Sequence, residues 1–255
     1  MVKPIGIDIS RWQHPVNWVN MEKAHPAFLV HRATIARDYI DPFFFSSAVE
    51  CQNRRIPFSA YHVVRCDYTA QSQITNFISA LKLAGAEKTS LPLVIDCELD
   101  NGKSQAQIAQ IVYDCLHMLE DYNGKKPMIY SRKNWVEVNI GAKQWLNEYD
   151  WWIAMYPNKD VLPGYDRTPE PPVPVDLERV LIHQFTANGN GKTYGTTSLS
   201  IDQNWWQGDQ SNLDAYIANY TGATPPVPPA PLPDKTINDR VTALEVAARA
   251  HGWEI

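Results

Sequence analysis

The chain has 255 residues, of which 44% are apolar and 20% are charged, and its formal net charge is −5. This length and composition allow one large domain with a sizeable core, or two smaller domains. The negative charge and the scattered Lys and Arg residues exclude a basic surface of the kind that binds nucleic acid or anionic lipid. No apolar run approaches the roughly 18 residues of a membrane-spanning helix, so no membrane span is predicted.

The cysteine and N-terminal patterns favour a protein made in a cytosol. None of the four cysteines, Cys51, Cys66, Cys97 and Cys115, lies in a CxxC pair or in a Cys/His cluster with zinc spacing. We therefore predict four free thiols that pack as small hydrophobic groups, and neither a metal site nor another cofactor. The first residues lead directly into an apolar segment, without the charged and then apolar stretch of a signal peptide.

Eight short apolar segments of β character recur between Ile5 and Asp202. They are Ile5–Ile9, Phe28–Arg32, Phe58–Val63, Leu91–Glu98, Met128–Tyr130, Trp152–Met155, Val180–Phe185 and Leu199–Asp202. Helical patterns occur at Thr69–Ala84, Ser104–Tyr122, Trp135–Tyr149 and Leu213–Tyr220. Strands alternating with helices predict an α/β fold built as a parallel TIM-like (β/α) barrel.

Two features make the predicted barrel irregular. The connections between the last four strands are shorter or less regular than the earlier ones, and residues 157–179 form a Pro-rich loop with no helical period. We therefore expect a distorted barrel with irregular last strands. The helix boundaries are better marked, because Ser104 is a suitable N-cap, Gly124 stands where the same helix would end, and Asp209 or Ser211 precedes the last helix.

The C-terminal part of the chain differs in composition from the rest. Residues 221–234 (TGATPPVPPAPLPD) are a Pro-rich linker, because repeated prolines favour an extended polyproline conformation. Residues 235–255 follow with an amphipathic helical stripe of Ile237, Val241, Leu244, Ala248 and His251. So short a helix is marginal by itself in water, so we expect it to form a homo-oligomer or to dock on the barrel of residues 1–220. A frayed tail is the alternative.

The segment Leu91–Glu98 ends in two carboxylates, Asp96 and Glu98. Side chains two residues apart on a strand point to the same side, so these acids share one face and Cys97 lies on the other. Placing two acids at the end of a buried strand costs folding free energy, and a chain that does so usually uses them for chemistry. Paired carboxylates are typical of glycoside hydrolysis.

The ends of the other expected strands carry polar and aromatic side chains, and functional residues of a barrel gather at those ends. The candidates are Asp8, Tyr61, His62, Tyr130, Trp152, Tyr156, Gln184 and Asp202. Each has an ordinary structural reading: Asp8 or Asp202 could cap a turn, and His62 by itself is better read as a core histidine. Together, four acids and several aromatic residues at one end predict an active-site cleft.

Six motifs occur in an order known from one enzyme family. They are GIDISRWQ at residues 6–13, Tyr61-His62-Val63, Ile95–Glu98, Trp152–Tyr156, His183-Gln184-Phe185 and Ile201–Asn204. In these motifs the chain, over residues 4 to 220, resembles glycoside hydrolase family 25, the Chalaropsis-type lysozymes found among phage endolysins and bacterial cell-wall hydrolases. The departures are Cys97 between the two acids and the Pro-rich insertion at 157–179.

The resemblance implies an N-acetylmuramidase that cleaves the β-1,4 bond between N-acetylmuramic acid and N-acetylglucosamine in peptidoglycan. Glu98 would be the general acid, with a pKa raised by its surroundings and by the charge of Asp96. Asp96 would be either the nucleophile or the group that orients the substrate acetamide for substrate-assisted attack. Asp8 and Asp202 would complete an acidic floor, and the expected substrate contacts are Tyr61, His62, Tyr130, Trp152, Tyr156 and Gln184.

Two other functions stay open at this point. One is a chitinase-like barrel glycosidase, although the longer D-x-x-D-x-D-x-E run of such enzymes is absent. The other is a non-catalytic protein that binds cell walls. For the muramidase, the expected partner is peptidoglycan rather than nucleic acid. We expect a phage or prophage endolysin that is made in the host cytoplasm and released to the wall at lysis.

Overall fold

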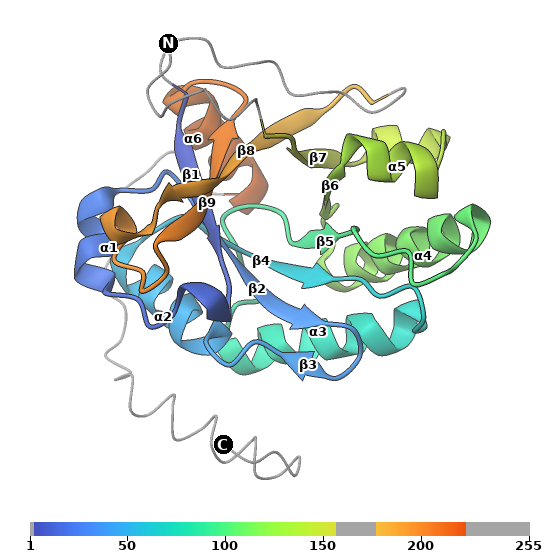
Figure 1. Cartoon of the computed structure of the whole chain (residues 1–255), viewed down its shortest axis with the longest axis horizontal. Coiled ribbons are helices and arrows are strands. Elements are labelled where there is room, and N and C mark those ends of the chain that lie inside the picture. Colours follow the sequence, from blue (N-terminus) through green and yellow to red (C-terminus); the bar gives the residue numbers. More distant parts are fainter. Residues whose placement is uncertain (1–2, 157–176, 223–255) are drawn as a thin grey trace.

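A closed β-barrel forms the centre of the molecule, which the computed structural model describes over residues 3–156 and 177–222 (Figure 1). In the described part, the strands in chain order are β1 (Ile5–Ile9), β2 (Leu29–Ile35), β3 (Tyr39–Ile40), β4 (Phe58–Val63), β5 (Val94–Asp96), β6 (Met128–Arg132), β7 (Asp150–Ala154), β8 (Val180–Asn190) and β9 (Ser200–Trp206). The barrel order is β1-β9-β8-β7-β6-β5-β4-β2, and pairing of β1 with β2 closes it. The short β3 extends β2 as an antiparallel hairpin. The predicted α/β barrel is confirmed.

The last strand is the irregular one, as predicted. β9 runs antiparallel to both of its neighbours, β8 and β1, whereas the other barrel strands run parallel to one another. It follows β8 through the single turn of η3 (Gly191–Tyr194), and so short a connection cannot make the crossover that a parallel strand requires. We expected the last strand to end at Asp202, whereas β9 begins two residues before Asp202 and continues to Trp206.

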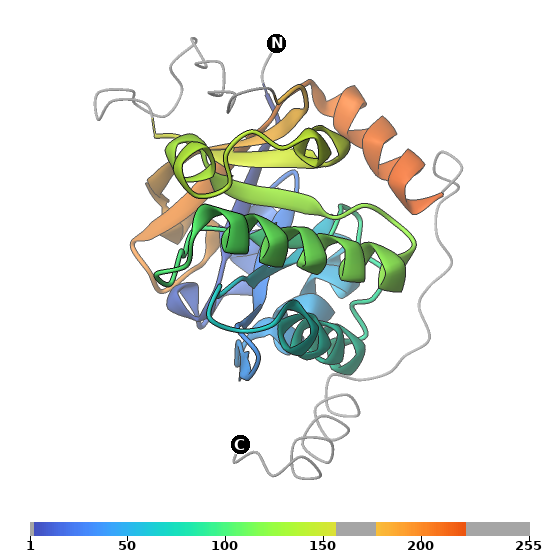
Figure 2. The ribbon, with the colours of Figure 1, turned by 90° about the vertical axis from the view of Figure 1, so that its right-hand side faces the viewer.

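The described helices are α1 (Trp18–Ala24), α2 (Phe44–Arg54), α3 (Ala70–Ala84), α4 (Gln105–Asn123), α5 (Lys133–Asn139) and α6 (Gln210–Thr221), with the short 3-10 helices η1 (Arg11–Gln13) and η2 (Gln144–Glu148). Figure 2 shows α3 and α4 side by side along the barrel. The predicted caps Ser104, Gly124 and Asp209 are confirmed. The sequence analysis missed α1 and α2. The N-cap residue of α2 is Phe43, which makes no side-chain cap hydrogen bond, so the start of this helix carries no capping signal.

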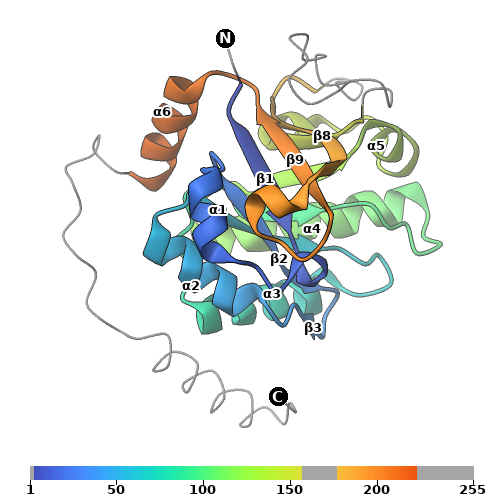
Figure 3. The same ribbon diagram turned by 60° about the vertical axis from the view of Figure 1, so that its left-hand side comes forward.

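Two apolar layers hold the barrel and its helices together. Outward-facing residues such as Ile7, Ile9 and Cys97 pack beneath the helices, and all four cysteines are free and buried, as predicted. Inward-facing residues such as Val94 and Met128 fill the barrel and reach Leu213 of α6. Figure 3 shows α6 beside the start of β1, so this helix closes the end of the barrel where the parallel strands begin. The opposite end stays accessible.

Some predictions concern residues outside the described part: most of the Pro-rich loop at 157–179, the linker from 223 onward and the helix at 235–255. Thr221 and Gly222, which we assigned to the linker, are the last residue of α6 and its C-cap. In the described residues, no helix is long and apolar enough to cross a membrane.

Gly6 makes room for an aromatic ring inside the barrel. A Cβ atom built on Gly6 would overlap the ring of Phe28, which is fully buried just before β2. The backbone of β1 and the Phe28 ring therefore lie too close for any larger residue.

We predict that Gly6→Ala lowers the free energy of unfolding by about 1–3 kcal/mol, the usual cost of overpacking a core. Urea unfolding followed by circular dichroism measures this change. In the double variant with Phe28→Leu, part of the loss should be recovered, because the two positions share one space. Strictly additive losses would contradict this explanation.

Candidate active site

A cavity of about 230 Å³ lies at the end of the barrel where the parallel strands terminate. Its described lining consists of acids, aromatic residues, one amide and one guanidinium: Asp8, Tyr61, Asp96, Glu98, Tyr130, Arg132, Trp152, Tyr156, Gln184 and Asp202. Nine of these ten residues are those that the sequence analysis selected. The structure therefore brings candidates from seven different strands and their ends into one site.

Strand register explains this convergence. Asp96, Tyr130 and Trp152 are direct neighbours across β5, β6 and β7. On the other side of the barrel, Asp8 of β1 stands opposite Asp202 of β9. Since neighbouring residues in register point to the same face of a sheet, these side chains all enter the barrel mouth.

His62 is placed differently, and the expectation that it contacts the substrate is corrected. Tyr61 points into the barrel and contacts Trp152, so the next residue on β4 points outward. The buried His62 ring shares a hydrogen bond of 2.7 Å with the hydroxyl of Thr34 and stacks on Phe77 of α3. It is a core histidine, which was its better reading in isolation.

Neutral amides hold the Asp8 carboxylate in place. Its Oδ2 atom accepts hydrogen bonds from Gln184 Nε2 at 2.9 Å and from Asn204 Nδ2 at 2.8 Å. The amide of Asn204 is oriented in turn by the indole N–H of Trp152, which donates to its Oδ1 atom at 2.7 Å. Burial raises the pKa of Asp8 to about 6, and these two donors act in the opposite direction.

Gln184 is fixed by two phenol groups. The hydroxyls of Tyr130 and Tyr156 both donate to its Oε1 atom at 2.9 Å. Because that oxygen accepts both bonds, the Nε2 atom must face Asp8. The two tyrosines thus determine which end of the amide meets the acid.

Asp202 holds a proton at neutral pH. Its burial, followed by the charges of Asp8 and Glu98, raises its pKa to about 8. The neutral carboxyl donates a hydrogen bond to Asp8, which stands opposite it in the antiparallel pair. The two acids therefore act as a hydrogen-bonded unit with one negative charge.

Asp96 and Glu98 form the second pair of acids. Asp96 is only 7% exposed, and its Oδ1 atom has no hydrogen-bond partner in the described residues. Burial, the charge of Glu98 and the charge of Asp8 raise the pKa of Asp96 well above its ordinary value. Burial also raises the pKa of Glu98, against the influence of Arg132. Both carboxyls of the pair are therefore harder to ionise than free carboxyls.

Arg132 is the lining residue that the sequence analysis missed. Its Nε atom lies 3.2 Å from Glu98 Oε1. We expected the strand to end at Tyr130, whereas β6 continues to Arg132. The signal was present in the spacing, because Arg132 follows Tyr130 by two residues and so points to the same face.

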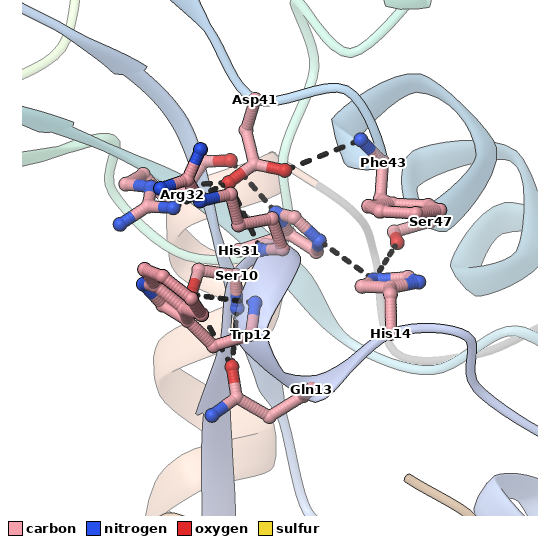
Figure 4. Close-up of polar contacts among 10 residues, drawn as sticks. Ser10, Trp12, Gln13, His14, His31, Arg32, Asp41, Phe43 and Ser47 are labelled. Atoms are coloured by element: carbon pink, nitrogen blue, oxygen red, sulfur yellow. Dashed lines mark hydrogen bonds and ion pairs between the residues drawn. The ribbon is translucent and has the colours of Figure 1, made fainter. Parts of the chain in front are cut away.

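Figure 4 shows a polar cluster around Asp41 and Arg32. Arg32 pairs in register with Tyr61, whose side chain lines the cavity. The fully buried Asp41 accepts hydrogen bonds from Arg32 Nε at 3.0 Å, from Arg32 Nη2 at 2.8 Å and from the backbone N–H of Arg11 at 3.0 Å. The charge of Arg32 tends to lower the pKa of Asp96. Beside this ion pair, His14 and His31 are hydrogen-bonded at 3.1 Å, and burial lowers the pKa of each to about 4, so both stay neutral.

The described residues contain no group of three or more His, Cys, Asp and Glu side chains that could hold a metal ion. The carboxyls that line the cavity can transfer protons and stabilise positive charge.

A barrel whose strand ends carry paired acids and aromatic residues defines the class of barrel glycoside hydrolases. Residues 7–193 match the family model of the glycosyl hydrolases family 25, and the chain belongs to this family. The resemblance found in the sequence is confirmed, and the protein is a glycoside hydrolase of the lysozyme (muramidase) type.

Individual relatives agree with this assignment. Lysozyme M1 from Streptomyces globisporus is 25% identical over 223 residues, which cover 85% of this chain and 71% of that protein. The uncharacterized protein YegX from Escherichia coli K12 is 28% identical over 217 residues, covering 83% of this chain and 72% of the relative. The bacterial lysozyme from Streptomyces coelicolor has the same fold, with a TM-score of 0.72 and 21% identity over 88% of this chain and all of that one.

The raised pKa of Asp202 predicts a pH-dependent stability. Between its ordinary pKa of 3.8 and its folded-state pKa of about 8, the folded protein binds a proton that the unfolded chain has released. The free energy of unfolding contributed by this group therefore falls as the pH rises through that window. We predict that Asp202→Asn makes the protein more stable than wild type at pH 8, by at least about 1 kcal/mol, with little difference near pH 4.

Urea unfolding of both proteins at several pH values checks this prediction. Asp121→Asn on the exposed face of α4 is the matched control and should keep the wild-type slope. Equal slopes for wild type and Asp202→Asn would show that Asp202 does not hold the proton.

Proposed function

We propose that the chain is an N-acetylmuramidase that cleaves the β-1,4 bond between N-acetylmuramic acid and N-acetylglucosamine. Membership of glycosyl hydrolases family 25 supports peptidoglycan as the substrate. The observation that carries the choice of reacting groups is the pair Asp96 and Glu98, two carboxyls with raised pKa values that line one cavity.

Glu98 is the general acid in this proposal. Its side chain is 28% exposed, so it is the member of the pair that a substrate entering the cavity can reach. A raised pKa lets it hold a proton near neutral pH and deliver it to the leaving glycosidic oxygen. After departure of the leaving group, the same carboxylate activates the incoming water.

Asp96 is best suited to orient the substrate acetamide. Asp96 lines the cavity, and when Glu98 is protonated an ionised Asp96 can accept a hydrogen bond from the acetamide N–H. That bond aims the acetamide oxygen at the anomeric carbon, so the substrate supplies its own nucleophile. Direct attack by Asp96 on the sugar is the alternative role.

The remaining lining residues bind and position the sugar in this proposal. Tyr61, Tyr130, Trp152 and Tyr156 provide aromatic faces and hydroxyls in the cavity. Asp8, with Asp202 protonated beside it, keeps a fixed negative charge close to the developing positive charge of the sugar ring.

We expect Glu98→Gln to lower kcat on purified peptidoglycan by about 10²–10⁴-fold, the usual contribution of a general acid and base. Asp96→Asn should be severely impaired as well. The control Glu137→Gln alters an acid of α5 that pairs with Lys133 and lies outside the cavity lining. Glu137→Gln should unfold at a temperature close to that of wild type, and the two active-site variants at the same temperature or a higher one, because each removes a carboxyl whose ionisation the site disfavours.

Mass spectrometry of the released fragments tests the bond itself. Products with N-acetylmuramic acid at the reducing end support the proposal. Products with N-acetylglucosamine at that end would identify a glucosaminidase. Faster cleavage of chitin than of peptidoglycan would instead favour a chitinase-like enzyme. Near-wild-type activity of Glu98→Gln would remove Glu98 from the mechanism.

The division of the chain and the role of its C-terminal helix stay predictions. We infer from the heptad-like stripe of residues 235–255 that this helix associates into a homo-oligomer and adds avidity on a repetitive wall. Size-exclusion chromatography should show an oligomer for the full chain and a monomer after deletion of residues 223–255. A monomer in both cases would exclude this role. Release of the protein from a host cytoplasm at lysis also stays a prediction.

A further inference from the structure

Arg132 places a positive charge beside Glu98, the proposed general acid. Its guanidinium forms an ion pair with Glu98, with 3.2 Å between Nε and Oε1. A positive charge at this distance favours the ionised form of Glu98, whereas a general acid must hold a proton. The free enzyme therefore carries an interaction that works against its own first catalytic step.

The position of Arg132 is fixed while its side chain is accessible. Its backbone pairs with Ala154 of β7, and it occupies the N-cap position of α5 without a side-chain cap hydrogen bond. The side chain is 61% exposed and donates no hydrogen bond to any described residue. The guanidinium thus has its donors available to a ligand in the cavity. Arg32, in contrast, is engaged by the buried Asp41.

We propose that Arg132 is a receptor for a carboxylate of the substrate glycan, and that binding this carboxylate draws the guanidinium away from Glu98 and allows Glu98 to take up its proton. The ligand class is an acetylated amino-sugar chain that carries carboxylates, either on the lactyl ether of the muramic acid or on its peptide stem. The inference rests on the proposed role of Glu98 as general acid.

The charges around Glu98 determine how its pKa changes when Arg132 leaves it for a substrate carboxylate. The groups that face it are Asp8 on β1, Asp96 on β5, Tyr130 on β6, Tyr156 after β7, Asp202 on β9 and Arg132 itself. Among these described neighbours, Arg132 supplies the positive charge that lowers the pKa of Glu98. Once a substrate anion engages it, the other described groups that face Glu98 are neutral or acidic, so the pKa of Glu98 rises and the proton is retained.

Guanidinium chemistry makes such an exchange favourable. Arginine binds a carboxylate best through two parallel N–H···O bonds, and this geometry is stronger and more specific than a single ion pair. The contact with Glu98 is an ion pair without hydrogen-bond geometry, since Oε1 of Glu98 has no hydrogen-bond partner in the described part. A substrate carboxylate that forms both bonds therefore competes successfully with Glu98.

The test compares wild type, Arg132→Gln and the matched control Lys133→Gln, whose lysine is the next residue and faces Glu137 rather than the cavity. Two substrate pairs are used. The first is peptide-free glycan with its lactyl carboxylates free or converted to methylamides. The second is peptide-bearing glycan with its peptide carboxylates free or converted in the same way.

We expect wild type and Lys133→Gln to favour the free carboxylate by about tenfold in kcat/KM in one of the two pairs, which identifies the source of the anion. Arg132→Gln should lose this preference. On the methylamide substrate, the basic limb of its pH profile should lie at higher pH than in wild type, because Glu98 has lost its cation. A wild type without preference in both pairs, or a preference kept in Arg132→Gln, overturns the proposal.

A binding measurement separates this proposal from the proposed function. Calorimetry of the same glycan pairs with Glu98→Gln, with and without Arg132→Gln, reports carboxylate recognition without any cleavage. If wild type cleaves no glycan but Arg132 still gives a preference in binding, the proposed muramidase activity fails and the receptor role survives. Equal binding of free and methylamide forms by Glu98→Gln excludes the receptor role.

Discussion

The described lining of the cavity holds four carboxyl groups and one guanidinium, and this crowding of acids is the constraint on which the rest of the site depends. Asp8, Asp96, Glu98 and Asp202 cannot all be ionised in a partly desolvated space. Their pKa values rise accordingly, and the proton that Asp202 holds at neutral pH relieves part of the repulsion. A supply of protons at neutral pH, which acid catalysis needs, is therefore a consequence of crowding the acids together.

The barrel makes this crowding possible because its apolar interior packs independently of the acids at the strand ends. Apolar side chains and α6 fill the end where the parallel strands start, so the strand ends at the other side are held at fixed spacing. The antiparallel β9 brings Asp202 opposite Asp8 by a hairpin rather than by a crossover. Neutral donors such as Gln184 and Asn204 then fix Asp8 without adding charge. Packing of the barrel and α6 raises the free energy of unfolding, whereas the crowded acids lower it when they ionise.

The sequence predicted this arrangement as far as strand periodicity reaches. The spacing of Asp96 and Glu98 placed both in the cavity and Cys97 in the outer layer, because alternation is a local property of the backbone. It failed for His62, since a parallel strand is buried on both faces and its composition does not show which face is inside. Arg132 was missed because the strand was ended two residues early, and strand ends depend on pairing partners that are distant in sequence.

The charge distribution also bears on how an acidic protein binds an acidic polymer. A chain with a net charge of −5 and four acids in its cavity would repel a glycan that carries carboxylates. The raised pKa values reduce the negative charge of the cavity, and the exposed Arg132 adds a positive charge at its edge. Arg32 and Arg132 differ in their surroundings. Arg32 is held by the buried Asp41 and lowers the pKa of Asp96. Arg132 is exposed beside Glu98, so under the proposal above a substrate anion that binds Arg132 changes the charge next to Glu98, and recognition is coupled to protonation at this position.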